Sequence, residues 1–211
     1  MTESRIEEIF FHRATGQCHI YIGPMCSGKT LEINNKLTMA ADIGLKVLRI
    51  GHISDIRNTK SIDIKNGVTS HNSQFVKISK DIQSIMVNNL SDVDPNGYHV
   101  IGIDEGQFFP DLYLNVKRWV MDLGKIVHIA SLDADSNLEL FGQVTQLIPI
   151  AETVTKKTAM CIFCLQHQSG RIITPAITTV CKVKKTGQTL VGGLEAYSPA
   201  CLKCWSSVSA D

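Results

Sequence analysis

The sequence predicts an α/β fold in which helices cover both faces of a parallel β-sheet, followed by a small metal-binding lobe. Short apolar runs alternate with longer amphipathic segments from Cys18 to about Leu132, which is typical of parallel strands joined by helices. A glycine-rich turn lies between the first strand-like run and the first helical segment. Two C-x-x-C pairs lie near the C-terminal end, and this spacing is common in metal sites.

Apolar runs predict strands at residues 18–22, 46–50, 75–78, 98–103 and 125–129. Amphipathic segments predict three helices. The first runs from Lys29 towards Gly44, which can end it. The second runs from Ser79, a possible cap, to about Leu90, and the third from Asp111 to Leu123. Strand–helix alternation at this spacing requires crossover connections, so the predicted sheet is parallel.

Length and composition are those of an ordinary globular domain. The chain has 211 residues, is 44% hydrophobic and 19% charged, and carries a formal net charge of +1. This near-neutral balance argues against a dedicated nucleic-acid-binding protein, which normally carries a basic stripe. No run of apolar residues is long enough for a membrane span, and residues 1–8 are acidic without the apolar core of a signal peptide. We therefore expect a cytosolic, cytoplasmic protein without a membrane partner.

The glycine-rich turn fits the phosphate-binding pattern G-x-x-x-x-G-K-[ST], the P-loop. Its glycines let backbone N–H groups close around phosphate oxygens, and the start of the following helix adds its dipole. Lys29 is expected to reach the β- and γ-phosphates of ATP, and the Thr30 hydroxyl to bind Mg²⁺. The predicted nucleotide-binding residues are Gly23, Pro24, Met25, Cys26, Ser27, Gly28, Lys29 and Thr30.

Two carboxylates follow the strand predicted at residues 98–103. At this strand end Asp104 is expected to hold Mg²⁺ through water, and Glu105 to act as a general base near the transferred phosphoryl group. If Glu105 activates water, the protein is an ATPase, such as a motor or recombinase fragment. If it deprotonates an acceptor hydroxyl, the protein is a small-molecule kinase. Phe108 and Phe109 favour the kinase, because a nucleobase can stack on an aromatic ring, although at least one of them is expected in the core.

The cysteine pairs Cys161/Cys164 and Cys201/Cys204 provide four thiolates, enough for a tetrahedral, structural Zn²⁺ site. Without an export signal, this spacing favours metal over disulfides, with free thiols or a redox pair as the alternative. The long separation of the pairs indicates a loop pinned at its base rather than a compact finger. The other three cysteines are expected to be non-ligands, namely Cys18, Cys26 and Cys181.

Apolar periodicity fades after about Glu152. We therefore predict a domain boundary there. Residues 1–152 would form the nucleotide-binding domain, and residues 153–211 the zinc-binding lobe.

Six motifs follow one another between about His19 and Cys204: G-P-M-C-S-G-K-T, I-D-E-G-Q-F-F-P-D, F-G, C-x-x-C, V-G-G-x-x-x-Y and C-x-x-C. In their order and spacing they resemble the motifs of the type II (cytosolic) thymidine kinases. The resemblance implies a P-loop domain related to the recombinase core and a zinc-ribbon lobe with a lasso loop over the nucleoside. It implies phosphoryl transfer from Mg·ATP to the 5′-hydroxyl of thymidine, giving dTMP. It also implies feedback inhibition by dTTP and a homotetramer or homodimer, with no nucleic-acid partner. The runner-up interpretation is a P-loop ATPase with a zinc-ribbon tail that acts on DNA or protein.

The resemblance also implies roles for residues at matching motif positions. Glu105 matches the catalytic base, and Arg57, in Asp55-Ile56-Arg57, should approach the phosphates. The sequence departs from the pattern in a longer stretch at residues 171–192 and in residues 133–138, which lack a phenylalanine often found beside the nucleoside. The residues expected to bind the nucleoside are Met25, Phe108, Phe141, Ser169, Leu190, Val191 and Tyr197.

Overall fold

The computed structural model describes residues 16–55, 67–69, 75–77, 82–167, 173–182 and 196–208. At its centre lies a six-stranded sheet in the order β5-β2-β6-β7-β1-β8, and every neighbouring pair in it is parallel. Its strands are β1 (Gln17–Ile22), β2 (Val47–His52), β5 (Ile82–Val87), β6 (Val100–Ile103), β7 (Ile126–Ser131) and β8 (Thr153–Lys156). The predicted α/β fold with a parallel sheet is therefore confirmed.

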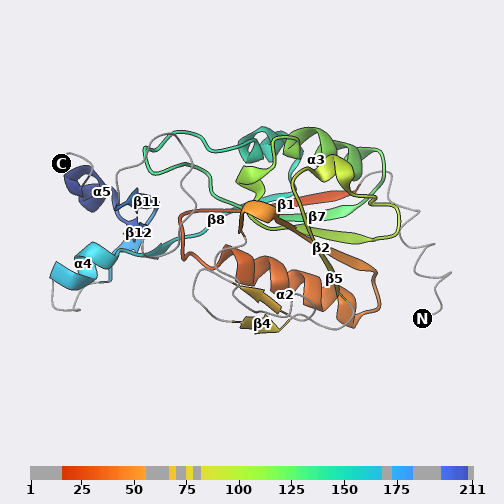
Figure 1. Ribbon diagram of the computed structural model, residues 1–211, viewed down its shortest axis with the longest axis horizontal. Helices are drawn as coiled ribbons and strands as arrows, with labels where there is room; N and C mark the ends of the chain where they lie inside the picture. Colours follow the sequence, from red (N-terminus) through yellow and green to blue (C-terminus); the bar gives the residue numbers. More distant parts are fainter. Residues whose placement is uncertain are drawn as a thin grey trace.

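Helices cover both faces of the sheet (Figure 1). On one face lies α2 (Lys29–Asp42), and on the other lie α3 (Leu112–Met121) and the 3₁₀ segment η4 (Val144–Ile150). The antiparallel pair β3 (Gly67–Thr69) and β4 (Phe75–Lys77) stands apart from the central sheet. Three further single-turn 3₁₀ segments are η1 (Ile53–Asp55), η2 (Leu90–Asp92) and η3 (Gly106–Phe108).

The main core lies between α3 and the sheet. Trp119, Leu112 and Val116 of α3 are fully buried there, together with Phe109 and strand residues such as Ile101. The apolar side of α2 is buried on the opposite face of the sheet, through Ile33 and Leu37. Because both faces are covered, all side chains of β2 and β6 are buried, as expected for central parallel strands.

One predicted element is wrong: the helix expected from Ser79 to Leu90 is in fact the strand β5. Its residues pair in parallel with β2, from Val47–Ile82 to His52–Val87. Ile85 and Val87 then pack against the main core. A helix at this position would leave the outer edge of β2 unpaired, and the β-branched residues of this segment suit a strand. Tertiary pairing therefore overrides the local helical pattern.

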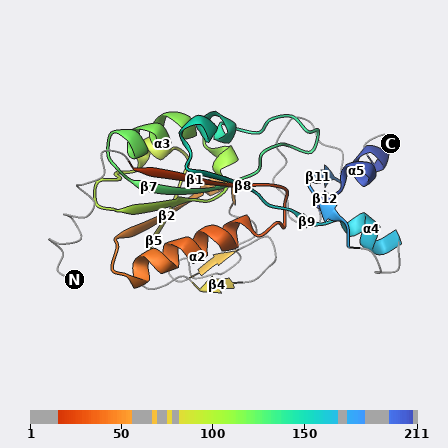
Figure 2. The same ribbon diagram turned by 180° about the vertical axis from the view of Figure 1, so that it is seen from behind.

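The C-terminal lobe, which we define as the described residues from 159 to 208, lies beyond one end of the sheet (Figure 2). It contains two short antiparallel pairs and two short helices. These elements are β9 (Ala159–Met160), α4 (Ile162–His167), β10 (Pro175–Ala176), β11 (Thr178–Cys181), β12 (Tyr197–Ala200) and α5 (Leu202–Val208). Strand β8 follows the predicted boundary at residue 152 but pairs with β1, so the central sheet extends past that residue.

Among the described residues, no helix is both long enough and apolar enough for a membrane span.

Candidate active site and cysteine cluster

The P-loop joins β1 to α2, as its motif predicts. Gly23 has a φ of +139°, and a Cβ there would lie 2.3 Å from the carbonyl oxygen of Lys157. Gly28 has a φ of +80° and precedes the first turn of α2. Both positions therefore require glycine. The Ser27 hydroxyl of this loop is buried and has no hydrogen-bond partner among the described residues, which suits a group that binds an incoming phosphate oxygen.

Lys29 lies within this loop rather than in solvent. Its Nζ donates hydrogen bonds to the carbonyl oxygens of Gly23, at 3.0 Å, and of Pro24, at 2.7 Å. Burial lowers the pKa of the Lys29 ammonium, while the carboxylates of Glu105 and Asp104 oppose this effect. The predicted phosphate-binding lysine therefore lies beside both predicted carboxylates.

Asp104 lies at the C-terminal end of β6 and contacts the start of α2. The Thr30 hydroxyl and the Glu105 backbone N–H each donate to Asp104 Oδ1, at 3.1 Å. Arg49 of β2 donates from Nη2 to Asp104 Oδ2 at 2.6 Å. Thr30 and Asp104 are far apart in the sequence but lie together, and a hydroxyl and a carboxylate oxygen are ligands that suit Mg²⁺.

Glu105 is held in an unusual backbone conformation. Its φ is +53°, in the left-handed region, and its side chain is buried. Gln107 donates from Nε2 to Glu105 Oε2, and its Oε1 accepts from the Leu132 backbone N–H at 2.9 Å and the Ser131 hydroxyl at 3.2 Å. Because Leu132 N–H must meet an oxygen, the amide of Gln107 is oriented with its NH₂ towards Glu105. A non-glycine residue at positive φ costs about 1 kcal/mol, and such strain is concentrated at functional sites.

The predicted nucleoside-binding aromatics are partly brought together. Phe108 meets Phe141 edge to face, with ring centroids 5.8 Å apart, and both rings are half-buried. Phe109 is fully buried in the core, so one of the two adjacent phenylalanines is structural, as predicted. His52 contacts Phe108 and Phe109 at centroid distances of 5.5 and 4.9 Å.

Met25 connects the P-loop to the C-terminal lobe. Its side chain is 3% exposed, and its backbone N–H donates to Thr179 Oγ1 of β11 at 3.1 Å. Tyr197 is half-buried in β12, paired with Cys181 of β11. The remaining predicted site residues lie outside the described residues: Arg57, Ser169, Leu190 and Val191.

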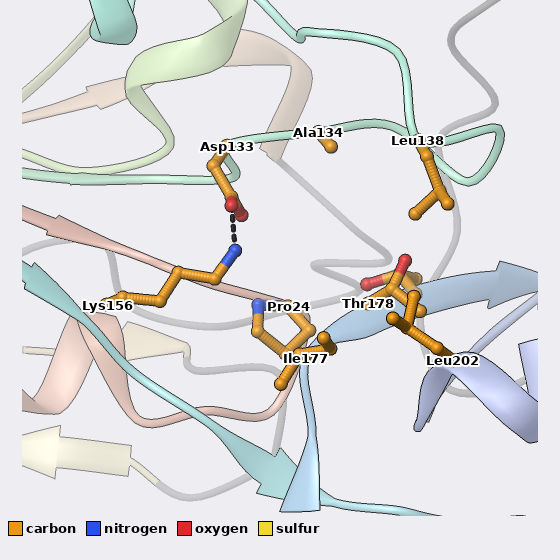
Figure 3. Close-up of a pocket in the computed structure, with 9 residues that line it drawn as sticks. Pro24, Asp133, Ala134, Leu138, Lys156, Ile177, Thr178 and Leu202 are labelled. Carbon is orange, nitrogen blue, oxygen red and sulfur yellow. Dashed lines mark hydrogen bonds and ion pairs between the residues drawn. The ribbon is translucent and has the colours of Figure 1, made fainter.

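A pocket of about 220 Å³ opens between the P-loop and the lobe (Figure 3). Lys156 and Asp133 form an ion pair on one side of it, and Leu138 and Leu202 lie on the other. Across the same boundary, Trp205 Nε1 donates to the Ser136 carbonyl oxygen at 2.8 Å. The pocket residues are Pro24, Asp133, Ala134, Leu138, Lys156, Ile177, Thr178, Thr179 and Leu202. The lobe is therefore attached to the loop that follows β7 as well as to the P-loop.

The four predicted zinc ligands lie together in the lobe. The Sγ atoms of Cys161, Cys164, Cys201 and Cys204 are all within 4.8 Å of one another. Cys164 Sγ lies 3.8 Å from that of Cys201 and 3.6 Å from that of Cys204. A tetrahedral Zn²⁺ with Zn–S bonds of about 2.3 Å holds its sulfurs about 3.8 Å apart. The cluster therefore fits a structural zinc ion.

Two thiols of this cluster have pKa values shifted in opposite directions. Burial raises the pKa of Cys161, but hydrogen bonds from the backbone and thiols of Cys164 and Cys201 outweigh it and lower that pKa to about 7. Burial and the neighbouring cysteines raise the pKa of Cys204 to about 12. A thiolate at Cys161 therefore opposes ionisation of Cys204, and a bound dication would favour the thiolate form of both.

Two residues of the site were missed by sequence reasoning, Arg49 and Gln107. Arg49 is a charged residue within an apolar strand-like run, and a charge at a fully buried position needs a partner. Gln107 lies two residues after Glu105. The charge of Arg49 within an apolar run was a signal that this residue has a buried partner, but the sequence did not identify Asp104 as that partner.

Comparison with known proteins agrees with this geometry. A family model described as thymidine kinase matches residues 16–205. The thymidine kinase of Fowlpox virus is 33% identical over 195 residues, covering 92% of this chain and 99% of the relative. Thymidine kinase 1 of Dictyostelium discoideum is also 33% identical, over 91% of this chain and 78% of the relative, and thymidine kinase a of Arabidopsis thaliana is 33% identical over 90% and 75%. The resemblance seen in the motifs is thereby confirmed, and the chain belongs to the thymidine kinase family.

Proposed function

We propose that this chain is a thymidine kinase that transfers the γ-phosphoryl group of ATP to the 5′-hydroxyl of thymidine, with Glu105 as the general base. The observation that carries the proposal is the meeting of the P-loop with the end of β6. There, Thr30 Oγ1 lies 3.1 Å from Asp104 Oδ1, and Glu105 follows directly. Family membership supports thymidine as the acceptor and a nucleoside triphosphate as the donor.

In the proposed reaction, the Glu105 carboxylate takes the proton of the 5′-hydroxyl. The nucleoside oxygen forms a bond to the γ-phosphorus as the bond from that phosphorus to the β,γ-bridging oxygen breaks, and ADP leaves. Lys29 and the P-loop N–H groups stabilise charge on the phosphate oxygens. Thr30 and Asp104 would hold Mg²⁺, which neutralises charge on the β- and γ-phosphates when bound. Gln107 donates to one oxygen of Glu105 and so orients this carboxylate.

The ATPase alternative is less well supported. It requires water, rather than a nucleoside, beside Glu105. The half-buried edge-to-face pair Phe108 and Phe141 offers an apolar aromatic surface of the kind on which a nucleobase packs. The relatives that match over almost the whole chain are named thymidine kinases.

The nucleoside pocket is proposed to use residues on both sides of the boundary between the P-loop and the lobe. Met25 links the two sides through Thr179, and Phe108 and Phe141 would lie beside the base. Lasso residues would close the pocket and approach the thymine edge, and Arg57 would approach the phosphates. The proposed lasso residues are Ser169, Leu190, Val191 and Tyr197.

The cysteine cluster is proposed to bind structural Zn²⁺. Four thiolates complete a tetrahedron and leave no position for a reacting water. Residues 165–200 lie between the two cysteine pairs, so the metal would hold both ends of the lasso. We also propose, from the resemblance to the type II enzymes, that the protein is cytoplasmic and forms a homotetramer or homodimer. On the same basis, dTTP would inhibit it by feedback.

The test is a panel of deoxynucleosides incubated with the protein and Mg·ATP, with nucleoside monophosphate as the product measured. We expect dTMP from thymidine, and ATP consumption that depends on nucleoside and not on DNA. The control is the Glu105→Gln variant under the same conditions. ATP hydrolysis without monophosphate, or hydrolysis stimulated by DNA, would favour the ATPase instead.

A further inference from the structure

Arg49 is a buried cation with defined partners beside the P-loop. Its side chain is 4% exposed and that of Asp104 is 5% exposed. Arg49 Nη2 donates to Asp104 Oδ2 at 2.6 Å, and Nε donates to Asn34 Oδ1 of α2 at 3.1 Å. The guanidinium therefore connects β2 with the end of β6 and with α2. A planar group with several fixed donors can do this, whereas a flexible ammonium cannot.

Gly51 lies two residues after Arg49, on the same face of β2, and its lack of a side chain leaves space for Met86 of β5. A Cβ at Gly51 would lie 2.5 Å from Met86 Sδ and 3.8 Å from Arg49 Nη1. A side chain at that position would therefore displace the Met86 side chain and would come into ordinary van der Waals contact with the guanidinium. Arg49 itself is buried within β2, so its place is set by the strand.

Both oxygens of Asp104 are engaged, and they have different partners. Oδ1 accepts from the Thr30 hydroxyl and the Glu105 N–H, each at 3.1 Å, while Oδ2 accepts from Arg49. The carboxylate plane is thereby fixed. Oδ1 is the oxygen on the Thr30 side, where the metal is proposed to bind, and the strong charge-assisted bond to Oδ2 resists rotation of the group.

We infer that Arg49 is a positioning residue, which fixes Asp104 with Oδ1 towards Thr30 and prevents this carboxylate from capturing a divalent cation before nucleotide binds. The inference rests on the proposed function, because it assigns Arg49 a role at the proposed Mg²⁺ site. A full positive charge in contact with Asp104 repels a free dication, and it occupies the oxygen needed for bidentate binding. The phosphates of the nucleotide add further negative charge beside Asp104, so the cation enters with ATP.

The experiment measures Mn²⁺ binding to the nucleotide-free, zinc-loaded protein by electron paramagnetic resonance. Mn²⁺ prefers oxygen ligands, so it probes Asp104 rather than the cysteine cluster. Arg49→Met is expected to tighten Mn²⁺ binding by about tenfold or more, since it removes the competing charge. Adding Asp104→Asn to Arg49→Met is expected to abolish the gain. Unchanged or weaker Mn²⁺ binding by Arg49→Met would overturn the inference, as would a gain that survives in the double variant.

Lys157→Met is the matched control. Lys157 also forms an ion pair with a residue of α2, from Nζ to Glu32 Oε2 at 2.8 Å, but it does not contact Asp104. The Lys157→Met variant is expected to bind Mn²⁺ as the wild-type protein does. An equal gain in this variant would mean that any positive charge near α2 has the same effect, and the role of Arg49 would be refuted.

Arg49→Lys separates orientation from charge, and it provides the test if Arg49→Met does not fold. It keeps the charge but cannot reach Asp104 and Asn34 together. We expect wild-type Mn²⁺ binding, with kcat about tenfold lower and an unchanged KM for thymidine. Wild-type kcat in this variant would refute the orienting role. Phosphorylation of thymidine by the wild-type protein is measured in a separate assay. Its absence would overturn the proposed function, whereas the Mn²⁺ binding results test only the role of Arg49.

Discussion

The stability of this protein is expected to fall between about pH 6.5 and about pH 4 because of His128. His128 lies in β7 on the face covered by α2 and is 9% exposed. It stacks on His19, with ring centroids 4.8 Å apart, and its Nδ1 lies 3.4 Å from the Tyr21 hydroxyl. Burial, and then the positive charges of His19 and Lys36, lower the pKa of His128 from 6.5 to about 4.

The sign and size of the effect follow from the two pKa values. As the pH falls through 6.5, histidine in the unfolded chain binds a proton, whereas His128 in the folded chain stays neutral until about pH 4. The unfolded state therefore gains protons first, and the free energy of unfolding falls with falling pH across this window. A difference of about 2.5 pH units at 1.36 kcal/mol per unit gives a loss of about 3 kcal/mol from His128 alone.

The assay is urea unfolding at a series of pH values from about 7 to about 4.5, compared between wild type and His128→Gln. Glutamine does not titrate, so the variant is expected to have a shallower decline, and the difference between the two curves reports the titration of His128 together with its coupling to His19. If the cysteine cluster holds zinc, its acid-linked loss would affect both proteins equally and cancel in that difference. Parallel curves for the two proteins over the whole window would refute the reasoning.

Three further predictions concern the proposed site. Lys29→Ala should weaken ATP binding measured by calorimetry. Glu105→Gln should bind ATP normally and lose about 10²–10⁴-fold in kcat. Near-normal turnover by this variant would exclude Glu105 as the base. Elemental analysis should find one zinc per chain, and Cys164→Ser should lower both zinc content and melting temperature; a metal-free, active wild-type protein would contradict the structural role. Deoxycytidine should be used about 10²–10⁴-fold less efficiently than thymidine in kcat/KM, because two groups that read the thymine edge would each lose a partner worth about 1–3 kcal/mol. Deoxyuridine, which lacks only a methyl group, should be penalised less, and Tyr197→Ala should raise KM for nucleoside more than for ATP; equal use of thymidine and deoxycytidine would refute base reading.

Local sequence determined the elements whose conformation depends on near neighbours. The P-loop was identifiable because Gly23 and Gly28 occupy backbone positions that only glycine adopts easily. The apolar strand ending at Asp104 and the helix beginning at Lys29 were predictable for the same reason, since periodicity is a local property. The C-x-x-C pairs predicted the cysteine cluster, because each pair brings two sulfurs together within one turn of chain.

Tertiary structure decided what depends on which segments become neighbours. Residues 79–90 are numerous enough for a helix, but pairing of residues 82–87 with the edge of β2 selects a strand. Arg49 was visible as a charge in an apolar run. Its partner Asp104 directly follows another strand, β6, and comes within 2.6 Å of Arg49 only because β2 and β6 pair. A motif specifies the conformation of its own backbone, whereas the partner of a buried charge depends on strand order, which is set by the burial of apolar surface over the whole domain.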